Sequence, residues 1–240
     1  MLRIFIIQKI INFFDFFQQR KIFSFLKKKI NQNAVLFDVG AHYGETIENF
    51  KKNFNFSEIH SFEASIKNFN ILSKKYKEHN NSKIIINNFG LSDKNKELMI
   101  NQFIESSSST LSEINEKSHY FKRKIRILGL KENEKNYYQY VKVKLDLLDN
   151  YFKQKGINKI DLLKIDTEGH EYFVIKGSLS SLPKINYIYF EHHYDDMLDK
   201  KYTFSEIHKL LISNNFKKIF KSKMFFRKTF EYIYKNSKFD

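Results

Sequence analysis

One local pattern constrains the fold of this chain more than any other: an apolar run that ends in a glycine turn and continues as a helix. Residues 34–39 read Ala-Val-Leu-Phe-Asp-Val, Gly40 and Gly44 follow, and residues 45–53 have a helical pattern. Glycine allows the tight turn between a strand and a helix, and it lets backbone approach a ligand closely. The pattern therefore predicts the first βα unit of an α/β domain.

The rest of the chain repeats this alternation. We predict further strands at residues 58–63, 83–87, 160–166 and 185–191, and a second helix at residues 65–79. Strands that alternate with helices indicate a Rossmann-like α/β fold, with a mostly parallel central sheet and helices on both faces. We expect one domain over residues 31–240, with a polar, irregular insertion at about residues 105–140.

Residues 1–30 differ from this pattern, because they are basic and rich in Phe and Ile. Polar residues recur every three to four positions, which predicts an amphipathic helix. A membrane span needs about 20 uninterrupted apolar residues, and this segment is interrupted too often. Two interpretations stay open: the helix packs on the domain or on a second subunit, or it lies on an anionic membrane surface with Lys27, Lys28 and Lys29 near the lipid phosphates.

The composition bounds the partners and the compartment. The net charge of +15 comes with many Lys, Asn, Ile, Phe and Tyr residues, so we interpret it as a solvated lysine surface rather than a nucleic-acid footprint. The chain has no cysteine, which excludes disulfides, thiolate metal sites and cysteine nucleophiles. A reducing compartment fits this composition, so we expect a cytoplasmic protein, either free or peripheral on the inner membrane face.

The glycine turn is followed by an acid at an informative distance. Glu63 closes the second strand 19 residues after Gly44, the place where dinucleotide-type folds bind ribose hydroxyls. His42 stands where a dinucleotide fingerprint has its middle glycine, and its side chain would obstruct a pyrophosphate. The turn therefore favours S-adenosylmethionine over NAD, with Asp38 holding the ammonium group directly or through water.

A second group of polar residues follows the strand at residues 160–166. Asp166, Glu168, His170 and Glu171 lie within six positions at its carboxyl end, the edge where open α/β sheets bind ligands. Helix capping explains one of the carboxylates, but it does not explain all four groups.

The next strand also ends in polar residues, Glu191 and His192, and we expect both to line the same crevice. Several acids and two histidines leave a divalent metal open. Their spacing fits no standard metal motif, so we assign no metal ligands.

These motifs together resemble the FkbM-type methyltransferases over roughly residues 34–193. The matching segments are Asp38-x-Gly40-Ala41-x-x-Gly44-Glu45, Phe62-Glu63-Ala64, Gly90-Leu91-Ser92-Asp93, Leu145-Asp146, Leu163-Lys164-Ile165-Asp166-x-Glu168-Gly169-x-Glu171, Lys176-Gly177 and Glu191. The resemblance implies a class I methyltransferase fold, S-adenosylmethionine as methyl donor, and O-methylation of a macrolide, glycan or lipopolysaccharide hydroxyl.

The resemblance and the spacing together give the expected cofactor site. It comprises Asp38, Gly40, His42, Gly44, Glu45, Glu63, Leu91, Asp93 and Asp166. Within it, Glu63 corresponds to the ribose acid of the family, Leu91 and Asp93 fall where this fold usually places adenine, and the Asp166 region corresponds to the floor of the reaction crevice.

Methyl transfer from a sulfonium needs alignment and, for a sugar hydroxyl, a base. His170 is the first candidate, since its ordinary pKa suits the work and neighbouring carboxylates are expected to raise it. Asp166 and Glu168 compete for this role, and Glu191 or His192 is expected to orient the acceptor.

Two other functions stay open: a nucleic-acid methyltransferase, and a non-catalytic binding protein on the same scaffold. The first has no support from an N-methylation tetrapeptide (D/N-P-P-Y), because Pro183 is the only proline and lies in Ser-Leu-Pro-Lys. The intact acid set argues against the second.

Overall fold

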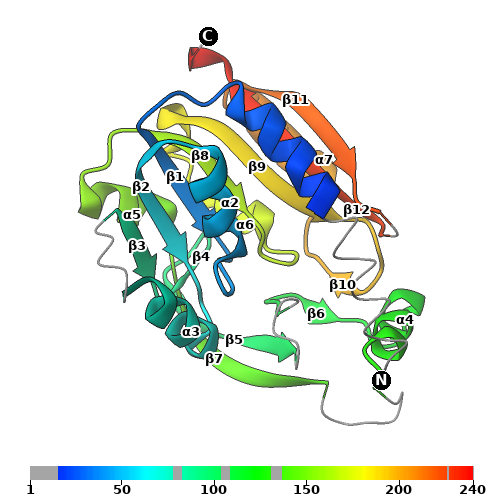
Figure 1. Ribbon diagram of the computed structural model, residues 1–240. Helices are drawn as coiled ribbons and strands as arrows, with labels where there is room; N and C mark the ends of the chain where they lie inside the picture. Colours follow the sequence, from blue (N-terminus) through cyan, green and yellow to red (C-terminus); the bar gives the residue numbers. More distant parts are fainter. Residues whose placement is uncertain (1–15, 78–82, 104–108, 131–136, 226, 240) are drawn as a thin grey trace.

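The computed structural model describes residues 16–77, 83–103, 109–130, 137–225 and 227–239 (Figure 1). Its central sheet has seven strands in the order β11-β12-β9-β8-β1-β2-β3. Their bounds are β1 Ala34–Val39, β2 Phe56–Phe62, β3 Ile84–Asn87, β8 Ile160–Ile165, β9 Ile185–His193, β11 Phe216–Lys223 and β12 Thr229–Asn236. Neighbouring strands from β3 to β9 are parallel. Strand β12 is antiparallel to both of its neighbours, β9 and β11. The predicted Rossmann-like fold with a mostly parallel sheet is confirmed.

Helices cover both faces of this sheet, as predicted. The helix at residues 16–27, α2 (Glu45–Asn53) and α3 (Ile66–Lys77) pack on one face, and α5 (Leu148–Lys155), α6 (Glu171–Lys176) and α7 (Phe204–Ser213) on the other. Alternate residues of β1 serve the two cores, because Leu36 packs with Phe50 of α2 whereas Phe37 packs with Leu148 of α5.

The described part of the N-terminal segment packs on the domain. Ile22, Phe23 and Leu26 are buried against the sheet together with Tyr187 and Tyr189 of β9. Their spacing places all three on one side of a helix. The predicted amphipathic helix thus packs on this chain through Ile22, Phe23 and Leu26, whereas the side chains of Phe16 and Phe17 are exposed (Figure 1).

The outer side of this segment does not test whether it binds a membrane surface. Lys27, Lys28 and Lys29 are exposed, and residues 1–15 lie outside the described part of the chain. No helix within the described ranges is long and apolar enough to cross a membrane. Binding to an anionic membrane surface stays a prediction.

Shorter elements lie beside the main sheet. They are β4 (Gly90–Leu91), β5 (Lys96–Phe103) and β7 (Tyr138–Asp146) in one small sheet, β6 (Glu113–Ile114) and β10 (Leu198–Asp199) in another, the helix α4 (His119–Ile127), and two short 3₁₀ turns at Leu182–Lys184 and Ser237–Phe239. Within the insertion, which we expected to be irregular, the structure describes α4. Its Ser118 side chain accepts a hydrogen bond from Phe121 N, and Phe121 and Ile125 are buried one turn apart.

Candidate functional site

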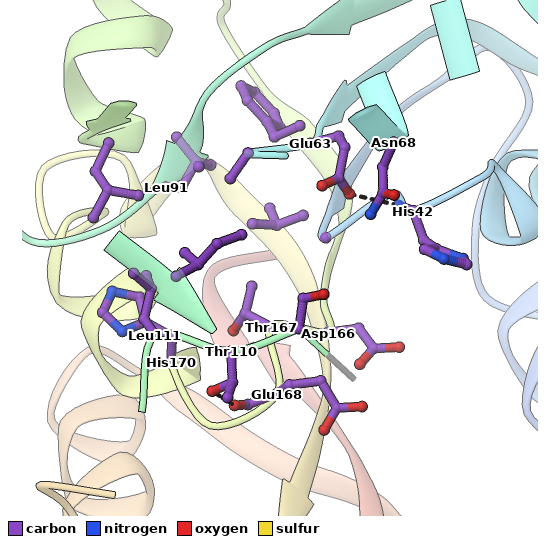
Figure 2. Close-up of a pocket in the computed structure, with 18 residues that line it drawn as sticks. His42, Glu63, Asn68, Leu91, Thr110, Leu111, Asp166, Thr167, Glu168 and His170 are labelled. Carbon is purple, nitrogen blue, oxygen red and sulfur yellow. Dashed lines mark hydrogen bonds between the residues drawn. The ribbon is translucent and has the colours of Figure 1, made fainter. Parts of the chain in front are cut away.

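A crevice opens at the carboxyl ends of β1 and β8, on either side of the point where the strand order reverses. Its volume is about 640 Å³, including its open mouth. The predicted residues that line it are Gly40, His42, Glu63, Leu91, Asp166, Glu168 and His170. In Figure 2, His42 and Glu63 lie on one side of the crevice, with Asp166 and Glu168 across from them. The two motifs singled out in the sequence therefore share one cavity.

Gly40 is where these two motifs touch. Its φ is +86°, in the left-handed region, and a Cβ there would lie 1.9 Å from the carbonyl oxygen of Asp166. The backbone N–H of Asp166 in turn donates to the carbonyl of Val39 at 2.9 Å. A side chain at position 40 would collide with the backbone of Asp166, so the close approach of these two backbone segments requires a glycine.

The rest of the turn shapes the crevice without lining it. Gly44 has φ +89°, and a Cβ there would lie 2.8 Å from Cδ1 of Leu72 in α3, which agrees with the predicted close helix packing. Glu45 is exposed, lies 3.2 Å from the His42 ring, and accepts a hydrogen bond from Tyr43 N. Gly44 and Glu45 thus support the turn from outside the lining residues.

Glu63 is held by backbone amides. One carboxylate oxygen accepts from His42 N at 2.8 Å and the other from Ser65 N at 2.9 Å. Burial raises the pKa of Glu63, and these two amides act against that rise. Beside it, the buried side-chain oxygen of Asn68 has no hydrogen-bond partner within the described residues, and Asn68 lines the crevice. Glu63 and Asn68 therefore both bring side-chain oxygen acceptors to the same part of the crevice.

The end of the crevice next to β4 is apolar. Leu91 lines it together with Phe62, Ile100 and Leu145. The predicted Asp93 lies outside the lining, where its carboxylate is 3.4 Å from Lys176. A flat, weakly polar group is what such a wall accommodates best.

Asp38 lies behind the crevice wall, fully buried. Burial raises its pKa to about 7, and neither of its oxygens has a hydrogen-bond partner in the described part of the chain. Lys164 lies between two carboxylates, 3.7 Å from Asp38 and donating to Asp166 at 3.1 Å. Although burial alone would raise the pKa of Asp166, Lys164 lowers it, so Asp166 lines the crevice as a carboxylate.

His170 lines the crevice but differs from the expectation. Burial lowers its pKa to about 4, whereas we expected neighbouring carboxylates to raise it. Its Nε2 lies 2.9 Å from the Ser92 hydroxyl and its ring stacks on Phe173. Burial lowers its pKa more than the nearby Asp93 carboxylate raises it. The prediction of a raised pKa is wrong because the loop directs the neighbouring acids elsewhere.

Glu171 shows where one of those acids goes. It is fully buried, and its carboxylate accepts hydrogen bonds from Thr167 N at 3.3 Å, Gly169 N at 3.0 Å and the Tyr202 hydroxyl at 2.5 Å. It holds the loop before α6 in shape from the first turn of that helix, but α6 has no side-chain N-cap hydrogen bond, so the expectation that capping accounts for one carboxylate is wrong.

Glu168 occupies the far end of the crevice with an unusual backbone. Its φ is +50°, and the Thr110 hydroxyl donates to its carbonyl oxygen at 2.5 Å. Its carboxylate lies 3.2 Å from Nε2 of His193, and Glu191 lies 3.3 Å from the same nitrogen. Glu191 stands behind the lining residues, so the expectation that it lines the crevice is wrong, and burial raises its pKa well above the ordinary range.

His193, not His192, is the histidine at this end. Successive residues of β9 face opposite sides, and His192 packs among Tyr194, Tyr202 and Phe204 on the other face. Burial lowers the pKa of His192 to about 4. The expectation that His192 lines the crevice is therefore wrong by one residue, since the strand continues through position 193.

The geometry and the family comparison agree. Residues 38–218 match the model of the methyltransferase FkbM domain, which is more than half of the chain. This chain belongs to the FkbM methyltransferase family. No curated protein matches it. The resemblance seen in the motifs is thus confirmed over a longer segment than the motifs themselves cover.

Solved structures share the fold of this FkbM domain at low identity. A methyltransferase FkbM from Methylobacillus flagellatus is 12% identical, with a TM-score of 0.50, over 85% of this chain and 43% of that protein. This chain therefore corresponds to less than half of that protein's length. An rRNA methylase from Streptococcus thermophilus is 8% identical (TM-score 0.50; 90% and 94% covered).

Several residues of the FkbM crevice had no signal in the sequence. Asn68, Ile100, Thr110 and Leu111 line it, and His193 stands behind it. Asn68 is an ordinary helix residue by pattern, and Thr110 and Leu111 follow a serine run without a motif. Among the residues that the structure describes, no three His, Asp or Glu side chains are arranged to hold a metal ion.

Proposed function

We propose that this FkbM protein transfers a methyl group from S-adenosylmethionine to a hydroxyl oxygen of a sugar-like acceptor, such as a glycan or lipopolysaccharide unit. One observation carries the proposal. The Gly40 turn with Glu63 and the Asp166–Glu168 segment lie on opposite sides of a single crevice. A donor at the first side and an acceptor at the second would meet in between.

The residues at the Glu63 side fit an adenosyl group. Two backbone amides and the Asn68 side chain orient the Glu63 carboxylate, whose two oxygens are the acceptors that ribose hydroxyls need. The unpartnered oxygen of Asn68 adds another acceptor. Leu91 and the apolar wall around it suit the adenine face.

When bound, S-adenosylmethionine supplies a methyl group on a positively charged sulfur. Because the leaving group departs neutral, the chain needs no oxyanion site, and its work is alignment and proton removal. Asp166 and Glu168 provide carboxylate oxygens at the acceptor side. Either one can orient a hydroxyl by accepting its hydrogen bond.

The hydrogen-bonding groups at the acceptor side favour a hydroxyl-rich acceptor over a nucleic-acid backbone. The residues that line this end of the crevice include Asp166 and Glu168. Carboxylate oxygens accept hydrogen bonds from sugar hydroxyls, whereas an ionised phosphodiester has no hydrogen to donate to them. We therefore propose a hydroxyl-rich acceptor.

Two measurements test this function in order. A calorimetric titration of the full chain with S-adenosylmethionine should show binding at one site. Silence at millimolar ligand would overturn the donor assignment. Incubation with methyl-labelled S-adenosylmethionine and either fractionated cell glycans or total RNA should then label the glycan fraction. Label in RNA alone would replace the acceptor class and leave the donor site intact.

A further inference from the structure

A histidine that neither the motifs nor the family comparison assigns stands behind the acceptor side of the crevice. We propose that His193 is a positioning residue that keeps Glu168 ionised and aimed into the crevice, so that Glu168 receives the proton of the acceptor hydroxyl. This inference rests on the proposed methyl transfer. It concerns a charge pair that can be measured without any acceptor.

His193 is surrounded by acceptors on both sides of its ring. Its side chain is 8% exposed, with Nε2 at 3.2 Å from Glu168 and 3.3 Å from Glu191. Its Nδ1 lies 3.5 Å from the Asp195 carboxylate and 3.2 Å from the Thr229 hydroxyl. Carboxylates this close to both nitrogens favour the charged imidazolium electrostatically, although Nε2 itself makes no hydrogen bond within the described residues. Burial acts against this charge, but the three carboxylates prevail and raise the pKa of His193 to about 10.

Glu168 needs this partner because its surroundings favour the neutral acid. Burial raises its pKa, and the negative charges of Asp166 and Glu171 act in the same direction. His193 opposes them most strongly, followed by Lys124 of α4. The other titratable groups around this end are Glu191 of β9, Tyr120 of α4 and Arg227, which precedes β12. Without His193, Glu168 would sit among acids with Lys124 as its main counter-charge.

The backbone conformation of Glu168 is also held in place. Its φ of +50° is a conformation that non-glycine residues rarely adopt, and Gly169 follows at φ +94°. The hydroxyl groups of Thr110 and Ser112 donate to the carbonyls of these two residues, at 2.5 and 3.0 Å. A strained conformation that its neighbours hold in place is typical of functional positions.

The proposed step balances without another reactant. The hydroxyl oxygen forms a bond to the methyl carbon as the carbon–sulfur bond breaks, and that electron pair leaves on sulfur as a neutral thioether. The hydroxyl proton passes to a Glu168 oxygen and then to solvent. His193 keeps its own protons throughout, so its contribution is electrostatic.

The charge pair is tested by ¹³C NMR of the full chain with glutamate labelled at the side-chain carboxyl, where the Glu168→Gln variant identifies the Glu168 signal. We expect His193→Gln to raise the pKa of Glu168 by about one to three pH units, the usual effect of losing an adjacent opposite charge. His193→Lys should restore most of the difference. His192→Gln, one residue away on the opposite face, should leave the Glu168 signal unchanged. An unchanged pKa of Glu168 in His193→Gln would overturn the proposal.

Measuring turnover against pH distinguishes a positioning role of His193 from a purely structural one. With the acceptor fraction that the labelling experiment identifies, His193→Gln should move the acid limb of the pH–rate profile upward by the same amount as the NMR shift. The rate should recover at higher pH, and affinity for S-adenosylmethionine should stay normal. A uniform loss of rate at every pH would contradict a positioning role. If His193→Gln does not fold, the Glu168 signal of the unsubstituted chain should still move a second time as His193 loses its proton near pH 10, and the absence of that movement refutes the proposal.

Discussion

The two sides of the crevice hold their carboxylates by different means. Glu63 is oriented by amides from its own neighbourhood, namely His42 N in the facing turn and Ser65 N two residues on. Glu168 is held by side-chain charge from distant elements, above all His193 of β9. Backbone dipoles fix a position with little dependence on pH, whereas a buried ion pair depends on the protonation of both partners. The donor side should therefore be sensitive to backbone changes, and the acceptor side to charge and pH.

The largest expected effect is at the junction of the two sides. Gly40→Ala places a Cβ about where the Asp166 carbonyl oxygen stands, at φ +86°. Strain and displacement together should destabilise the fold by about 3 kcal/mol or more. We expect S-adenosylmethionine binding to vanish in calorimetry. Gly156→Ala is the matched control, since φ there is +63° with nothing within 4 Å, and it should bind normally. Equal losses in both variants would show that strain alone, and not the Asp166 contact, governs the result.

The second prediction concerns the pH dependence of the acceptor side. The pKa of His193 is raised in the fold from an ordinary value of 6.5 to about 10, because the carboxylates around it outweigh burial. Its stabilisation is therefore fully present below pH 6.5 and is lost as pH rises through 10. His193→Gln should lower the free energy of unfolding at pH 6, measured by urea unfolding, by about 3 kcal/mol, the lower end of the cost of removing one partner of a buried ion pair. The gap should close toward pH 10. A gap that widens as pH rises would mean that His193 is neutral in the fold.

The contrast between the sides also explains how much the sequence could predict. The bounds of β1 and α2 agree with expectation, because an apolar run, a glycine turn and a helical period are local signals. Glu63 was found by its distance from that turn. His193 was missed because the end of β9 decides which of two adjacent histidines faces the crevice, and the sequence pattern does not locate a strand end to within one residue.

Electrostatics were the least predictable part. Asp166, Glu168, His170 and Glu171 look like one cluster in the sequence, yet the fold separates them. Glu171 turns inward to Tyr202, His170 turns to Ser92, and Asp166 and Glu168 remain at the crevice. The pKa of each group follows from its burial and from partners elsewhere in the chain, which spacing along the sequence cannot supply.

The third prediction sharpens the donor side. Glu63→Gln keeps the shape of the side chain but removes its charge and one acceptor oxygen. A hydrogen bond to a charged group contributes about 1.5 kcal/mol or more, so affinity for S-adenosylmethionine should fall roughly tenfold. Calorimetry measures the change, with the exposed Glu97→Gln on β5 as control. Because the acceptor side does not depend on Glu63, the NMR signal of Glu168 should stay in place. A moved Glu168 signal would show that the two sides are coupled.

The smallest expected effect is at His170, the first candidate for the base from sequence. Burial lowers its pKa to about 4, and its Nε2 already lies at hydrogen-bond distance from Ser92, so it is a weak proton acceptor near neutral pH. His170→Asn should retain turnover within about fivefold, whereas loss of a true general base costs about 100-fold or more. A modest loss of donor affinity is expected, since His170 lines the crevice and contacts the loop after Leu91. A large loss of turnover with normal donor affinity would return the base to His170 and would leave Glu168 with orientation of the acceptor alone.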